Sequence, residues 1–131
     1  MQPKDRVPDV WSLCDAALVH LKNDPAFTEV IPSKIFEAMA MGLPIVIAAP
    51  EGEATEIVAA EGAGVVVPPE DPAALAEAIR ALHRGFEDRK KYAAHSLAAT
   101  PRYSREKQAS EMIEVFDAAI GGRPAAPEEP L

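Results

Sequence analysis

The sequence has few aromatic residues, one cysteine and no long apolar run. Aromatic side chains make up only 5% of the 131 residues, so the core has to be built from Ala, Val, Ile and Leu. The single cysteine, Cys14, excludes an intramolecular disulfide framework and suits a reducing cytoplasm. No stretch reaches the roughly 18 apolar residues of a membrane-spanning helix, and the first residues contain no apolar signal-peptide core. We therefore expect a cytoplasmic protein and leave open a peripheral contact with a membrane.

Basic residues are also scarce. The chain has 13 Lys and Arg against 21 Asp and Glu, which gives a net charge of -8. Proteins that bind nucleic acids contact the phosphates through clustered Lys and Arg. The longest basic cluster, residues 89–91, is typical of a solvated helix face. The charge therefore argues against nucleic-acid binding.

What the sequence does contain is an alternation of apolar runs and amphipathic segments. Apolar runs predict strands at residues 16–21, 45–49 and 64–67, and the segments around them predict helices at 7–14, 32–41, 54–60, from 72 onward, at 86–100 and at 104–120. Strands that alternate with helices form a parallel sheet. The expected fold class is α/β: half of a Rossmann-like domain, with about three parallel strands and helices on both faces. We place this domain at residues 1–120 and expect a disordered tail at residues 121–131.

Three strands are few for this architecture, because doubly wound domains usually have about five or six. We expect residues 16–21 to form a buried strand. We also expect one strand at the edge of the sheet to be left open, and an open edge tends to pair with another chain. A second copy of the protein is one partner that such an edge could take.

Residues 32–37 are the strongest candidates for a binding site. Pro32 fits the first turn of a helix, which leaves the N–H groups of Ser33, Lys34 and Ile35 free to bind a diphosphate. The Lys34 side chain could add a positive charge or could face solvent. Glu37 lies one turn deeper, where its carboxylate could accept hydrogen bonds from the two hydroxyls of a ribose. It could equally do no more than complement the helix dipole.

Other candidates lie outside this helix. Glu29 precedes it and could reach the sugar of a bound donor, or it could be an ordinary loop acid. His20, at a strand end, could line the same cleft, or it could pack or face solvent. His83 and His95 lie on later helices without a neighbouring set of ligands, so we expect no metal site.

A family resemblance is found in residues 17–22, in Phe27 and in residues 31–45. The last of these contains Pro-Ser-Lys at 32–34 and Gly-Leu-Pro at 42–44. They resemble the C-terminal domain of retaining glycosyltransferases with the two-Rossmann (GT-B) architecture, and family 4 matches best. Residues 53–58 and 62–72 continue the similarity, which covers roughly residues 7–120. The Pro-Ser-Lys form is similar to bacterial enzymes of O-antigen and capsule assembly, including N-acetylfucosamine transferases.

The resemblance implies the donor-binding part of an enzyme that transfers a sugar from a nucleotide-sugar, UDP-linked, to a lipid-linked or polysaccharide acceptor without a cofactor. The family has two glutamates separated by seven residues, and Glu29 and Glu37 match that spacing. The resemblance implies that Glu37 binds the ribose and that Glu29, the catalytic candidate, faces the donor sugar. Residues 31–33 replace a common Gly-Phe-Gly stretch, so the diphosphate contacts should come from the backbone after Pro32.

Two parts of the family pattern are missing: the N-terminal acceptor domain, and an Arg/Lys pair that neutralises the donor diphosphate. Stabilising the leaving diphosphate is central to the reaction, so we expect the N-terminal half of the enzyme as a partner and the chain alone to be inactive. Two alternatives remain. One is a non-catalytic nucleotide-binding or self-associating α/β module. The other is a fragment of a nucleotide-sugar 2-epimerase, whose catalytic acids and histidine lack a convincing counterpart in this sequence.

Overall fold

Three parallel strands form one sheet in the computed structural model, which describes residues 3–121. The strands are β1 (Ala17–His20), β2 (Ile45–Ala48) and β3 (Gly64–Val67), in the spatial order β1-β2-β3. The helices are α1 (Val7–Trp11), α2 (Lys34–Ala40), α3 (Glu53–Ala60), α4 (Pro72–Arg84), α5 (Phe86–Ala99) and α6 (Arg105–Gly121), with short 3₁₀ turns at Lys4–Arg6, Pro25–Phe27 and Thr100–Tyr103. The predicted α/β fold with three parallel strands is confirmed. The chain divides into two units, residues 1–100 and residues 101–131.

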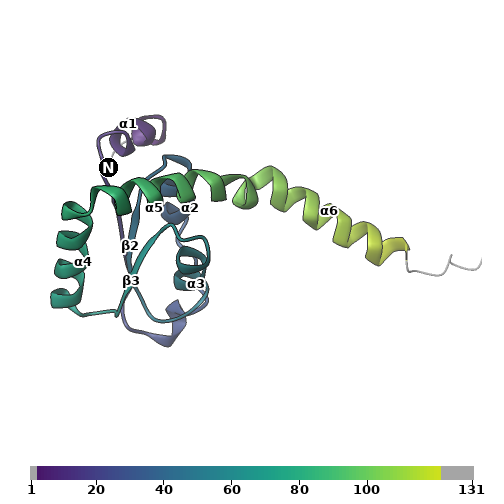
Figure 1. The fold of residues 1–131 in the computed structure, drawn as a ribbon. Coiled ribbons are helices and arrows are strands. Elements are labelled where there is room, and N and C mark those ends of the chain that lie inside the picture. The colour runs from purple at the N-terminus through teal and green to yellow at the C-terminus, as the bar shows by residue number, and fades with distance from the viewer. Residues whose placement is uncertain (1–2, 122–131) are drawn as a thin grey trace, which may run out of the picture. The chain divides into compact units, whose positions relative to one another are not determined.

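Helices cover both faces of the sheet, as Figure 1 shows for β2 and β3. α4 packs on these two strands from one side and α3 packs on them from the other. α2 packs on β1 and on α5. β2 is consequently buried along its whole length, which explains why its sequence is a continuous apolar run rather than an alternating one.

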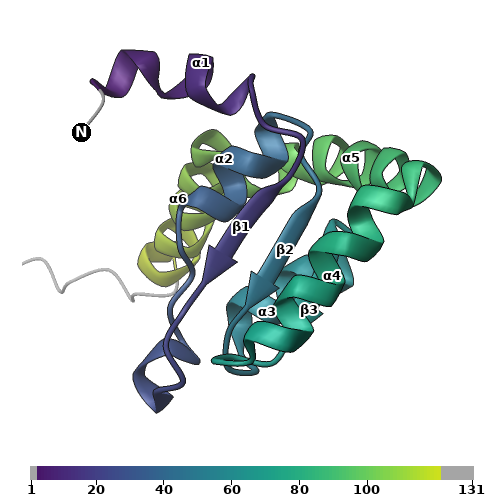
Figure 2. The ribbon, with the colours of Figure 1, turned by 90° about the vertical axis from the view of Figure 1, so that its left-hand side faces the viewer.

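The first strand departs from the prediction, because only one of its faces is buried. Ala17 and Val19 are buried, whereas Leu18 is 44% exposed and His20 is exposed. The predicted buried strand is wrong for this face because α4 packs on β2 and β3, and β1 lies at the edge of the sheet (Figure 2).

The outer edge of β1 has no neighbouring strand in the described sheet. The N–H groups of Ala17 and Leu21 donate to β2-side carbonyls, each at 2.8 Å. Residues alternate in direction along a strand, so the N–H and C=O groups of Leu18 and His20 point to the open side. The expected open edge is therefore β1.

α5 lies across the amino ends of β2 and β3. The fully buried hydroxyl of Ser96 donates to the Leu43 carbonyl oxygen at 2.8 Å, and Nδ1 of His95 lies 3.0 Å from the Gly62 carbonyl oxygen. Gly42, with a φ of +65°, ends α2 within one residue of the predicted position 41. Because α5 occupies the amino ends, the carboxyl edge of the sheet is left for a ligand, which is where ligands bind in open α/β sheets.

Replacing Ser96 by alanine is expected to lower the free energy of unfolding by about 1–2 kcal/mol, because the buried Leu43 carbonyl loses its donor. Chemical denaturation measures this change. Ser110→Ala, at an exposed position of α6, is the control and should change the free energy by less than about 0.5 kcal/mol. Equal effects of the two substitutions would contradict a stabilising role for the Ser96 bond.

The regular helix α2 begins later than predicted. Ser33 is its N-cap, and the Ile35 N–H donates to the Pro32 carbonyl oxygen at 3.1 Å. Pro32 therefore opens a tight turn that precedes the helix, rather than the helix itself. The residues that face the core, Ile35, Ala38 and Met39, are fully buried and hold the helix against the sheet.

The second unit contains α6. All its residues are exposed, and Lys107 lies 3.0 Å from Glu111 one turn further on. The hydrogen bond with Glu111, together with its negative charge, raises the pKa of Lys107. The predicted helix 104–120 is confirmed to within one residue at each end. Gly121 belongs to α6 instead of the predicted tail, and the rest of that tail lies outside the described residues.

Candidate functional site

Two loops meet at the carboxyl edge of the sheet. The loop after β1 and the loop after β2 are joined by the Glu53 N–H, which donates to the Thr28 carbonyl oxygen at 3.0 Å. Gly52 lies against the same oxygen, and a Cβ atom at this position would be only 2.0 Å from it. Only glycine permits so close an approach. This contact holds the loop that carries Glu29 against the loop that leads into α3.

The first turn of α2 presents a carboxylate beside unpaired backbone donors. Oε1 of Glu37 accepts a hydrogen bond from the Ser33 hydroxyl at 3.3 Å, and Oε2 accepts one from the indole Nε1–H of Trp11 at 3.2 Å. Glu37 and Ser33 are both exposed. Within residues 3–121, the N–H groups of Ser33 and Lys34 have no hydrogen-bond partner. The turn can therefore accept hydrogen bonds from a diol and donate them to an anion.

Ile35 does not belong to this set of donors. Its N–H bonds the Pro32 carbonyl oxygen, and its side chain is fully buried. The prediction of a free N–H group on Ile35 is wrong, because the Pro32 carbonyl oxygen accepts this N–H and closes the tight turn before α2. Lys34 is half-buried and forms no ion pair within the described part of the chain.

Glu29 stands apart from this cluster. It is exposed and follows Thr28, the residue that contacts the second loop. Over the range 3–121 it makes no hydrogen bond or ion pair, so nothing in the fold links it to Glu37. Its role stays a prediction.

Trp11 is the site residue that the sequence did not single out. Its partner Glu37 lies 26 positions away, and no local pattern relates a short helix before β1 to a carboxylate after it. The only available signal was that Trp11 is the single tryptophan of the chain.

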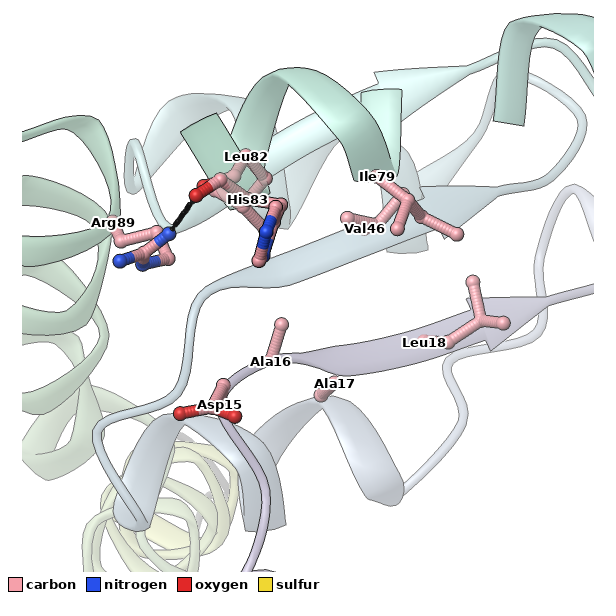
Figure 3. Close-up of a pocket in the computed structure, with 9 residues that line it drawn as sticks. All are labelled: Asp15, Ala16, Ala17, Leu18, Val46, Ile79, Leu82, His83 and Arg89. Atoms are coloured by element: carbon pink, nitrogen blue, oxygen red, sulfur yellow. Dashed lines mark hydrogen bonds between the residues drawn. The ribbon is translucent and has the colours of Figure 1, made fainter. Parts of the chain in front are cut away.

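An apolar hollow of about 400 Å³ lies beside the first half of β1 (Figure 3). It is lined by Asp15, Ala16, Ala17, Leu18, Val46, Ile79, Leu82, His83 and Arg89. The Arg89 guanidinium donates to the carbonyl oxygens of Leu82, at 3.0 Å, and His83, so it is engaged at the end of α4. None of the predicted site residues lines this hollow, which adjoins the exposed face of β1.

A second hollow, of about 370 Å³, lies at the carboxyl ends of β1 and β2. It is lined by His20, Leu21, Lys22, Ala48, Glu70, Asp71, Pro72 and Leu75. Glu70 has a φ of +56°, which is unusual for a residue with a side chain, and its carboxylate accepts the Asn23 N–H at 3.2 Å. His20 thus borders a hollow on the strand-end side, without contacting Glu29 or Glu37 in the described structure.

Within residues 3–121, no group of three or more His, Cys, Asp or Glu side chains is placed to hold a metal ion. None of the helices described for this chain has the length and apolar character needed to cross a membrane.

The three-stranded parallel sheet, followed after β1 by a helix whose first turn carries a carboxylate and free N–H groups, has the form of half a Rossmann-like domain. The family model described as "Glycosyl transferases group 1" matches residues 1–98, and the chain belongs to this family. The chain is similar to the D-inositol 3-phosphate glycosyltransferase of Xylanimonas cellulosilytica, with 32% identity over 120 residues. The match covers 92% of this chain and 27% of that relative, so the chain spans about a quarter of the relative's length. No solved structure matches the chain.

Proposed function

We propose that the chain is the donor-binding part of a retaining glycosyltransferase of the family-4 type that uses a UDP-linked sugar. The observation that carries the proposal is the exposed Glu37 carboxylate, held in the first turn of α2, the helix that follows the first strand of a parallel sheet. Membership of the group 1 family supports it, because a glycosyltransferase needs a site for its sugar donor.

Each group around the start of α2 has a role in this proposal. The N–H groups of Ser33 and Lys34 donate to the diphosphate, and the Lys34 ammonium adds positive charge. Pro32 sets the turn that orients these donors. Glu37 accepts hydrogen bonds from the ribose hydroxyls, and Glu29 faces the donor sugar as the catalytic group. No cofactor is required, since the nucleotide-sugar carries its own leaving group.

The remainder of the enzyme completes the proposal. An N-terminal half binds the acceptor, a lipid-linked sugar or polysaccharide in bacterial surface-glycan synthesis, and supplies the basic residues that neutralise the diphosphate. The similarity to a relative of which the match covers only 27% and the open edge of β1 support this division of labour. The chain alone is then inactive, and the complete enzyme works in the cytoplasm, in peripheral contact with a membrane if its acceptor is a lipid.

Titration of the ¹⁵N-labelled chain with millimolar UDP tests the proposal. We expect the amide signals of Ser33, Lys34 and Glu37 to shift, with saturation at a single dissociation constant. Inorganic diphosphate should shift the first two signals and leave that of Glu37 nearly unchanged. A spectrum that UDP does not change would overturn the proposed donor site.

The open edge of β1 favours a second candidate, a module that associates with itself. Leu18 exposes 44% of its surface there, next to unpaired backbone groups, and such edges pair with one another.

If the chain associates through this edge, Leu18→Lys should abolish self-association measured by sedimentation at about 100 μM, because a charged residue protects an edge strand. Leu13→Lys, at a site that is 85% exposed and outside the sheet, is the matched control. A wild-type chain that sediments as a monomer would eliminate this candidate.

A further inference from the structure

Trp11 joins the segment before β1 to the helix after it. Its indole Nε1–H donates to Oε2 of Glu37 at 3.2 Å, across 26 residues of sequence. Trp11 is the last residue of α1 and is half-buried, although α1 contains no fully buried residue. The contact between Trp11 and Glu37 is therefore a specific link between two elements rather than a product of core packing.

The two hydrogen bonds on Glu37 leave room for a ligand. Ser33 occupies one acceptor site on Oε1, and Trp11 occupies one on Oε2. An ionised carboxylate has about four such sites, so each oxygen keeps one that is free. Two adjacent hydroxyls, as on a ribose, present two donors to the two oxygens.

We propose that Trp11 is a positioning residue, which holds the Glu37 carboxylate in the orientation that accepts a ribose diol. This inference rests on the proposed function. An exposed glutamate otherwise samples several rotamers, and fixing one of them on binding costs conformational entropy. A side chain that is already fixed in the free protein binds its ligand more tightly, because that cost has been met beforehand.

Trp11→Phe tests the proposal, since phenylalanine keeps an aromatic ring but has no N–H donor. We expect the dissociation constant for UDP to rise about fivefold, the size of effect that follows when one flexible side chain has to be immobilised on binding. In a Glu37→Ala background, the same substitution should change the dissociation constant by less than about 1.5-fold, because coupled residues are non-additive. Tyr92→Phe, which removes an aromatic hydroxyl on α5, is the matched control and should bind UDP normally.

A second measurement needs no ligand. Three-bond couplings in the free chain should report a single χ1 rotamer for Glu37 in the wild type and an average over rotamers in Trp11→Phe. The single indole N–H signal should also shift in Glu37→Ala. Normal UDP binding by Trp11→Phe, or an averaged Glu37 rotamer in the wild type, would overturn the role of Trp11 alone. A wild type that does not bind UDP would overturn the proposed function and the ribose role together.

Discussion

Ile47→Ala is expected to lower the free energy of unfolding by about 3 kcal/mol or more. Ile47 lies at the centre of β2, opposite Val19 in β1 and Val66 in β3, and its side chain is fully buried. Alanine would leave a cavity in the one strand that is covered on both faces.

Chemical denaturation monitored by circular dichroism measures this loss. Ile113→Ala makes the same change on α6, where the side chain is 59% exposed, and should alter the free energy by less than about 0.5 kcal/mol. A loss below about 1 kcal/mol in Ile47→Ala, under the range for buried isoleucine, would show that the sheet is not packed as described.

Glu37→Ala is expected to raise the dissociation constant for UDP at least about tenfold. The substitution removes the carboxylate proposed to bind the ribose, and a hydrogen bond to a charged group contributes about 1.5–3 kcal/mol. The side chain is exposed, so the fold should be retained. Calorimetry or chemical-shift titration gives the dissociation constant.

Two variants serve as controls for the Glu37→Ala experiment. Glu87→Ala removes an exposed glutamate in the first turn of α5, far from α2 in the sequence, and should bind UDP as the wild type does. Glu29→Ala should also leave UDP binding nearly unchanged, since the proposed partner of Glu29 is the sugar and UDP has none. Undiminished UDP binding by Glu37→Ala would remove Glu37 from the donor site.

Features set by neighbouring residues could be predicted from the sequence. The apolar run 45–49 predicted the fully buried strand β2, and Gly42 predicted the end of α2. The start of α4 has a local cause as well, because the Asp71 carboxylate caps the helix and accepts the Ala74 N–H at 2.9 Å. In each case the cause and its effect lie within a few residues of one another.

Features set by distant residues could not be predicted. Leu18 has the composition of a buried strand residue, and its exposure follows from where α4 packs, more than 50 residues later. The contact between Trp11 and Glu37 likewise depends on how α1 meets α2. The predicted start of α2 at Pro32 is too early for a local reason. A proline fits the first turn of a helix and a tight turn equally well, and in the structure the Pro32 carbonyl oxygen accepts the Ile35 N–H, which forms a tight turn.

The bond between Ser96 and Leu43 has a consequence for the order of events during synthesis. It spans 53 residues, and the contact between His95 and Gly62 spans 33. All three strands have been made by residue 67, yet the amino ends of β2 and β3 lack their covering helix until α5 has left the ribosome. The nascent sheet is therefore expected to wait, with apolar strand ends uncovered, for about 30 residues of further translation. A chaperone that binds apolar segments should engage ribosome-bound chains of intermediate length and release them once α5 is complete.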